Sequence, residues 1–324
     1  MPPPEQSRRP ETIDDLLGPG LAARLDGVDL LSRKILQGKL PGERRSKRRG
    51  RSVEFDDFRQ YVPGDDPRHI DWNILGRLDR LFVKLFREEE DLSLSLIIDA
   101  SPSMDTGEPN KLVFACRLAA ALGYVGLANQ NRVSVAAFGV GEGVRRLAPA
   151  RGRGSVRRLL AFLLDVLKDS QRVGAPATDP QATFTSGLRT LGLAGGGGGR
   201  GVVVLLSDCL VPDDYHGAIS YLTGGRPEST DAWVLQVLTP AELDPARDPA
   251  LLGDLRLTDA ESARAVEVSV TDATLARYRA ALTAHNNRLR DECLRRGVRC
   301  VQTPSDSDVA PLVMGALRRG GMLR

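Results

Sequence analysis

The stretch LSLIIDASPSMD, residues 94–105, is the most informative part of this sequence for predicting the fold. An apolar run with the composition of a buried strand ends at Asp99, and Ser101 and Ser103 follow at alternate positions. An Asp-x-Ser-x-Ser sequence at the end of a strand places one carboxylate and two hydroxyls in a single loop. These hard oxygen donors are the ligands that Mg²⁺ prefers. The stretch therefore predicts both a buried strand and a divalent-metal site.

Strand-like and helix-like segments alternate along the rest of the chain from this stretch onward. Strands are expected at 92–100, 131–140, 202–208, 231–238 and 298–303, as continuous or alternating apolar runs. Helices are expected at 111–130, 154–168, 185–193, 215–222 and 272–296, from their helical periodicity. This βαβα order predicts an α/β fold with a doubly wound, mostly parallel sheet of the Rossmann type.

The sequence also divides into an N-terminal part and a domain with one interruption. Residues 1–11 are rich in Pro, Arg and polar side chains and are expected to form a disordered tail. Residues 12–91 are expected to form a helical and turn-rich extension that ends in a strand. Residues 92–324 then form the α/β domain. Within it, residues 240–271 have short alternating runs that predict a small antiparallel insertion.

The composition limits the class of protein. The chain has 324 residues, of which 41% are hydrophobic, and this is enough for a large buried core. Although 27% of the residues are charged, the net charge is only +3, so the composition does not imply binding to nucleic acid. The four cysteines lack metal-finger spacing, and no stretch approaches the ~18 uninterrupted apolar residues of a membrane span. We therefore expect a cytoplasmic protein that does not bind membranes.

A second acidic residue is expected at the same edge of the sheet as Asp99. Asp208 closes the apolar strand VVVLLSD, and ligands of doubly wound sheets bind outside the carboxyl ends of the strands. Together with the Asp-x-Ser-x-Ser residues it would hold Mg²⁺ if Thr185, at the start of a helix, added one more hydroxyl. The alternative is that Ser101 and Ser103 only cap the next helix or shape a turn. The order of these elements favours the metal site.

Three short motifs resemble the metal-ion-dependent adhesion site (MIDAS) of von Willebrand factor A-type domains. They are DASPSMD at 99–105, TFTSGL at 183–188 and LLSD at 205–208. The resemblance implies that one cation, Mg²⁺ or alternatively Mn²⁺ or Ca²⁺, is bound directly by the hydroxyls of Ser101, Ser103 and Thr185. It also implies that Asp99 and Asp208 act largely through water.

The threonine of this set has two candidates, Thr183 and Thr185. We prefer Thr185 because the helix that follows in the resembled family carries a buried Leu six residues later, which Leu191 matches here. Thr183 would place Arg189 at that position. Thr183 stays as the alternative.

The segment before the α/β domain resembles a second, narrower family. The run RQYVPGDDPRHIDW at 59–72 is similar to the signature of the bacterial family known as domain of unknown function 58 (DUF58), and the resemblance extends from Leu40 to the C-terminus. Members of that family couple this segment to an A-type domain and often accompany MoxR-type AAA+ ATPases. The resemblance therefore implies that such an ATPase is a partner of this protein.

A basic cluster at 44–51 lies at the start of the same segment. It would meet nucleic acid, an acidic partner surface or only water. Because the cluster contains no aromatic side chain and acidic residues follow it directly, nucleic acid is the least favoured partner. Arg48 and Arg49, with Arg68 further along, are candidate partner-binding residues. Trp72 is expected to anchor a core rather than to contact a partner.

Motifs of catalysis do not occur in the sequence. It contains no Gly-x-x-x-x-Gly-Lys-Ser/Thr loop, no His-Glu-x-x-His and no Gly-x-Ser-x-Gly, and the three histidines lie in different predicted elements. We therefore expect a non-catalytic, Mg²⁺-dependent protein-interaction module whose ion offers an open coordination position to an acidic side chain of a partner. The alternatives are an Mg²⁺-dependent phosphoester hydrolase that uses the same oxygens, and a nucleic-acid-binding protein that uses the basic cluster.

Overall fold

The chain consists of two compact units, one formed by residues 40–91 and the other by residues 1–39 together with 92–324. The computed structural model describes residues 8–31, 54–63, 65, 67–87, 92–141, 143–171, 180–193, 201–211, 215–224, 230–260 and 265–324.

The smaller unit is built on an antiparallel pair of strands. Its elements are β1 (Glu54–Gln60), the short turn η1 (Pro67–His69), α4 (Trp72–Leu78) and β2 (Phe82–Arg87). Helix α4 is capped by Asp71, whose side chain accepts hydrogen bonds from two backbone N–H groups of the first turn, at 2.9 and 3.2 Å. Trp72 is 65% exposed. The expectation that Trp72 anchors a core is therefore wrong for the described residues.

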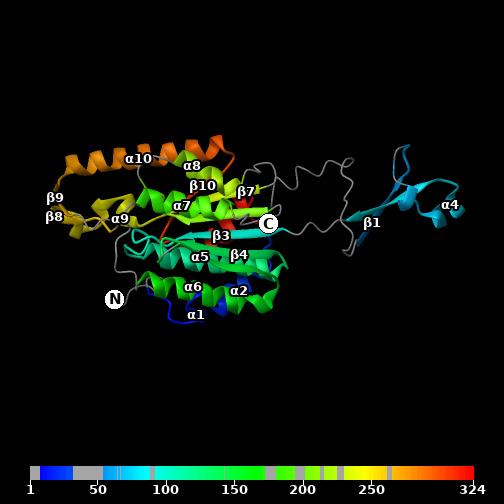
Figure 1. Cartoon of the computed structure of the whole chain (residues 1–324), viewed down its shortest axis with the longest axis horizontal. Helices are drawn as coiled ribbons and strands as arrows, with labels where there is room; N and C mark the ends of the chain where they lie inside the picture. The colour runs from blue at the N-terminus through cyan, green and yellow to red at the C-terminus, as the bar shows by residue number, and fades with distance from the viewer. Residues whose placement is uncertain are drawn as a thin grey trace. The chain divides into compact units, whose positions relative to one another are not determined.

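The larger unit is built around a sheet that has six strands in the described part of the chain (Figure 1). In spatial order these are β10 (Arg299–Pro304), β7 (Thr230–Leu238), β6 (Gly201–Ser207), β3 (Ser93–Asp99), β4 (Arg132–Phe138) and β5 (Val144–Ala150). Neighbouring strands are parallel, except that β5 runs antiparallel to β4 at one edge. The prediction of an α/β fold with a mostly parallel, Rossmann-like sheet is confirmed. Strand β5 was not predicted, because its Arg-containing sequence lacks the apolar run of a buried strand.

Helices cover both faces of this sheet (Figure 1). One face carries α1 (Ile13–Leu16), α2 (Pro19–Leu25), α5 (Lys111–Ala128) and α6 (Val156–Ser170). The other face carries α7 (Pro180–Leu193), α8 (Tyr215–Ser220) and α10 (Asp272–Arg295). Shorter helical turns are η2 (Arg153–Ser155), η3 (Tyr221–Thr223), α11 (Val309–Pro311), η6 (Leu312–Leu317) and α12 (Arg318–Gly320). A separate hydrophobic core lies on each face of the sheet.

Helix α5 is mostly apolar around its whole circumference, and the protein covers it on nearly all sides. Almost every one of its residues is buried, and the helix packs on β3, β4 and α6. Among the described residues it is the one helix long and apolar enough to cross a membrane. Since most of it is buried inside the unit, it has the surroundings of a core helix, and its composition alone is weak support for a membrane span.

The N-terminal residues belong to the larger unit and not to a separate extension. Leu16 of α1 and Leu25 of α2 are buried in the same core as α5 and α6. Arg9 donates to Asp105 over 2.7 Å, so part of the tail expected at 1–11 is ordered, while residues 1–7 lie outside the described residues. The expected extension of residues 12–91 therefore begins too early, because the apolar spacing of residues 12–31 reflects packing on α5 and α6.

The interruption after β7 forms an antiparallel hairpin. Its elements are α9 (Pro240–Leu243), η4 (Pro245–Arg247), η5 (Pro249–Leu251), β8 (Gly253–Thr258) and β9 (Ala265–Val270). Strands β8 and β9 pair with each other and not with the central sheet. Most of their side chains are exposed, so the hairpin adds little to either core.

Candidate functional site

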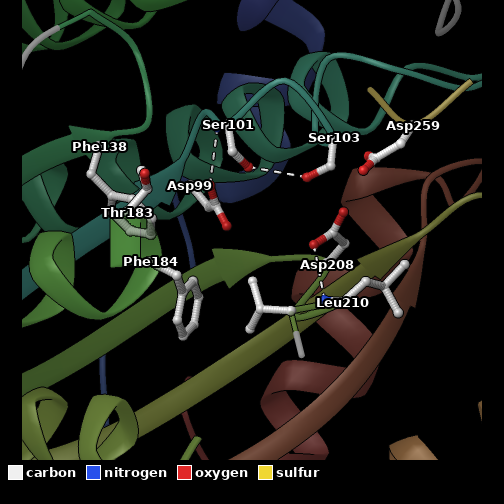
Figure 2. A pocket seen from close by; sticks show the side chains of 10 residues that line it. Asp99, Ser101, Ser103, Phe138, Thr183, Phe184, Asp208, Leu210 and Asp259 are labelled. Atoms are coloured by element: carbon white, nitrogen blue, oxygen red, sulfur yellow. Dashed lines mark hydrogen bonds between the residues drawn. The ribbon is translucent and has the colours of Figure 1, made fainter. Parts of the chain in front are cut away.

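A cavity of about 180 Å³ lies at the carboxyl ends of β3 and β6 (Figure 2). The chain leaves β3 towards β4 on one side, whereas β6 lies on the other side, so the strand order reverses between β3 and β6. Such a switch point is where open α/β sheets bind ligands. The polar lining consists of Asp99, Ser101, Ser103, Thr183, Asp208 and Asp259. The apolar lining consists of Phe138, Phe184, Leu210 and Val211.

Asp99 is the buried carboxylate at the end of β3. One of its oxygens accepts from the backbone N–H of Ser101 at 3.0 Å, and the other accepts from the hydroxyl of Ser207 at 2.7 Å. Burial raises the pKa of Asp99 to about 7, and the nearby charge of Asp208 adds to the rise. A cation in the cavity would offset both effects, because it favours the ionised form of a neighbouring carboxyl group.

The loop after β3 holds Ser101 and Ser103 side by side, with 3.1 Å between their hydroxyl oxygens. The loop rests on Gly139, which follows β4 and has a φ of +84°. A Cβ atom at Gly139 would lie 2.5 Å from the backbone nitrogen of Ser101, so only glycine allows this approach. The two serines do not cap α5, because the side chain of Asn110 accepts from the N–H of Val113 and performs that role.

Asp208 is held by a buried lysine that the sequence motifs did not predict. Lys111, at the start of α5, is 1% exposed, and its ammonium donates to Asp208 over 2.8 Å and to Glu242 over 2.5 Å. Burial lowers the pKa of Lys111, but the charges of Asp208 and Glu242 outweigh this effect and the pKa is raised. The other oxygen of Asp208 accepts from the N–H of Leu210 at 3.1 Å. A Lys at the first position of a mostly apolar helix was the signal available in the sequence.

Helix α10 and strand β7 fix the backbone that follows Asp208. Cys209 has a φ of +52°, which is a rare conformation for a residue with a side chain. Its carbonyl accepts from Nε2 of His285 at 2.8 Å. The carbonyl of Asp208 accepts from Gln236 at 3.2 Å, and Gln236 also donates to Asn286 at 3.0 Å. This buried network holds the loop after β6 in one conformation.

The threonine that lines the cavity is Thr183 and not Thr185. Both lie in the first half of α7. A step of two residues along an α-helix turns the side chain by about 200° around the helix axis, so the two threonines point in different directions. The next residue, Phe184, packs edge-on against Phe138 with 5.9 Å between the ring centroids. The structure thus favours Thr183, the alternative candidate. The spacing to Leu191, although this residue is buried, did not point to the threonine that lines the cavity.

A third carboxylate, from Asp259, lines the cavity and was not predicted. Asp259 directly follows β8 in the hairpin, and in Figure 2 its side chain lies near Ser103 and Asp208. Unlike Asp99 and Asp208 it is exposed. The sequence offered no signal for it, because an acidic residue at a hairpin turn is ordinary.

Of the candidate partner-binding residues, only Arg68 belongs to the part of the chain that the structure describes. Arg48 and Arg49 lie outside the described residues. Arg68 lies in η1 of the smaller unit and is exposed.

The donor set of the cavity fits a hard cation better than a soft one. Within the described ranges, no group of three or more His, Cys, Asp and Glu side chains is arranged to bind a metal ion. The cavity instead combines carboxylates with three hydroxyls, and all of these are oxygen donors. Oxygen ligands suit Mg²⁺ and Ca²⁺, whereas Zn²⁺ sites in proteins mostly use Cys and His. The residues present therefore fit the predicted Mg²⁺ through oxygen atoms alone.

The fold and the cavity define a class of protein: a Rossmann-like α/β protein with acidic and hydroxyl side chains at its switch point. Residues 57–288 match the family described as "Protein of unknown function DUF58", and the chain belongs to this family. Uncharacterized proteins of Mycobacterium bovis and Mycobacterium tuberculosis are 30% identical to it over 277 residues, which cover 84% of this chain and 80% of each relative. The resemblance to the DUF58 family is thereby confirmed.

Proposed function

We propose that the larger unit is a von Willebrand factor A-type domain, and that the protein is a non-catalytic, Mg²⁺-dependent interaction module of the cytoplasm. One observation carries this proposal. Loops after β3 and β6 and the first turn of α7, which are far apart in the sequence, bring two buried carboxylates and three hydroxyls to one cavity. This is the set that the MIDAS resemblance requires, with Thr183 in place of Thr185.

The residues of the cavity would have different roles in binding the cation. The hydroxyls of Ser101, Ser103 and Thr183 would bind the cation, and Asp99 and Asp208 would orient water around it. Because neutral hydroxyls leave much of the charge of the ion uncompensated, bound Mg²⁺ would supply an attractive position for an acidic side chain of a partner. Lys111 holds one oxygen of Asp208 and so fixes the direction of that carboxylate.

The partner that we propose is a MoxR-type AAA+ ATPase, which the DUF58 resemblance implies. The protein would then act as an adaptor in chaperone-like assembly or remodelling of other proteins. Mn²⁺ and Ca²⁺ are alternative ions for the same oxygen donors.

Direct binding between the full-length chain and the MoxR-type ATPase of the same organism tests this proposal. Biolayer interferometry should show binding in Mg²⁺ that is lost in EDTA and in an Asp99→Ala variant. Asp165→Ala, which removes an exposed carboxylate from α6, is the matched control and should bind normally. Binding that is indifferent to EDTA and to Asp99→Ala would contradict the proposal. Phosphoester turnover that disappears in Asp99→Ala would instead support a hydrolase.

A further inference from the structure

The β8–β9 hairpin brings a third carboxylate of this chain, that of Asp259, to the cavity. Asp259 lines the cavity together with Ser103 and Asp208 (Figure 2). A partner that binds through an acidic side chain would offer the same chemical group to the same cavity. An internal carboxylate at this place is therefore a natural competitor of an external one.

The segment that leads from β7 to the hairpin is attached to the residues that hold Asp208. Helix α9 links β7 to the hairpin, and its Glu242 shares the ammonium of Lys111 with Asp208. The carbonyl of Glu242 accepts from the hydroxyl of Tyr278 in α10 at 2.6 Å, and Arg279 pairs with Asp244 over 2.7 Å. These contacts attach the segment that leads from β7 to the hairpin to α10 and to Lys111.

The strands of the hairpin, in contrast, are weakly buried. Leu257 in β8 and Val266 in β9 form a cross-strand pair, and they are 46% and 59% exposed. A segment with so little buried apolar area can be displaced at small cost in stability. Asp259 therefore lies on an element that a partner is able to displace, whereas Asp99 and Asp208 are buried at the ends of core strands.

We propose that Asp259 is an internal ligand of the bound cation, and that it fills the coordination position until an acidic partner side chain replaces it. This inference rests on the proposed metal site. Carboxylates that line one small cavity repel one another, and a divalent cation bound beside them at the hydroxyls would offset that repulsion. The hairpin thereby makes binding selective, because only a partner that outcompetes Asp259 gains access to the ion.

Terbium luminescence of the full-length protein tests the inference, because Tb³⁺ is a hard cation and its lifetimes in H₂O and D₂O give the number of bound waters. The Asp259→Ala variant should show about one more bound water than the unsubstituted protein and bind Tb³⁺ about tenfold more weakly. Acetate should then remove the extra water, since it takes the place that Asp259 has left. Glu267→Ala, which removes an exposed carboxylate from β9 of the same hairpin, is the control and should change neither quantity.

Two results would overturn the inference, and they are distinguishable. If Asp99→Ala abolishes Tb³⁺ binding but Asp259→Ala changes neither the water count nor the affinity, the metal site stands and Asp259 is not its ligand. If the unsubstituted protein binds no Tb³⁺, both the metal site and the role of Asp259 are refuted. Circular dichroism of each variant confirms that the fold is retained.

Discussion

The loops after β3 and β6 and the β8–β9 hairpin contribute carboxylates to one cavity, but they are held in opposite ways. Asp99 and Asp208 are buried, and both oxygens of each accept hydrogen bonds from this chain. Asp259 is exposed and directly follows a strand that buries little surface. Most of the cavity is therefore fixed by the buried strands and the helices packed on them, whereas the insertion adds one exposed carboxylate. Substitutions in these two regions should have unequal effects.

The largest effect is expected at Lys111, whose removal would leave two carboxylates without their shared ammonium. Lys111→Met should reduce the free energy of unfolding by about 3–5 kcal/mol, as for one partner of a buried ion pair. Lys168→Met, at an exposed position of α6, should have almost no effect. Urea denaturation followed by circular dichroism measures both. Equal, small losses of stability in both variants would show that the ion pairs of Lys111 do not hold Asp208 in place.

The next largest effect is expected at Gly139, which supports the serine loop. Gly139→Ala places a methyl group 2.5 Å from the backbone nitrogen of Ser101 and keeps a positive φ, and should cost about 2–4 kcal/mol. Gly141 also has a positive φ but has nothing within 4 Å of a Cβ atom, so Gly141→Ala should cost only about 1 kcal/mol. The same denaturation series compares the two variants. A larger loss at Gly141 would contradict the close packing of the loop.

A pH effect is expected from Asp99. Its pKa is raised from 3.8 to about 7, so the folded protein binds more protons than the unfolded chain between these pH values. Stability without metal should therefore fall as the pH rises through this window, by up to about 4 kcal/mol, because one pKa unit corresponds to about 1.4 kcal/mol. Asp99→Asn should remove this slope, and Asp165→Asn should keep it. Urea denaturation in EDTA at several pH values provides the test, and a slope that survives in Asp99→Asn would refute the assignment.

The smallest effect is expected in the hairpin. Leu257→Ser and Val266→Thr replace exposed apolar side chains, and each should change the free energy of unfolding by no more than about 0.5 kcal/mol. A similar change at Leu206, which is fully buried in β6, should cost several times more. If the hairpin variants were equally costly, the hairpin would be part of the structural core and not a displaceable element.

The sequence predicted the parallel strands of the sheet and the cavity residues that follow β3 and β6. Apolar runs mark β3 and β6 clearly because both strands are buried, and the residues that end such strands lie at a common edge. The amino-acid pattern alone was therefore enough to assign Asp99, Ser101, Ser103 and Asp208 to one place.

The rest depended on features that local patterns do not carry. The choice between Thr183 and Thr185 depends on the phase of α7, which the packing of Phe184 on Phe138 sets. The role of Lys111 depends on Glu242, a residue far away in the sequence. Asp259 reaches the cavity through the path of an insertion, and no spacing rule describes that path.

A crystal structure of the full-length protein soaked with Mn²⁺, with anomalous scattering to locate the ion, tests whether the cavity is a cation site. One anomalous peak is expected in the cavity, within coordination distance of the hydroxyls of Ser101, Ser103 and Thr183. A cavity without a peak, while Mn²⁺ binds elsewhere on the protein, would contradict this expectation.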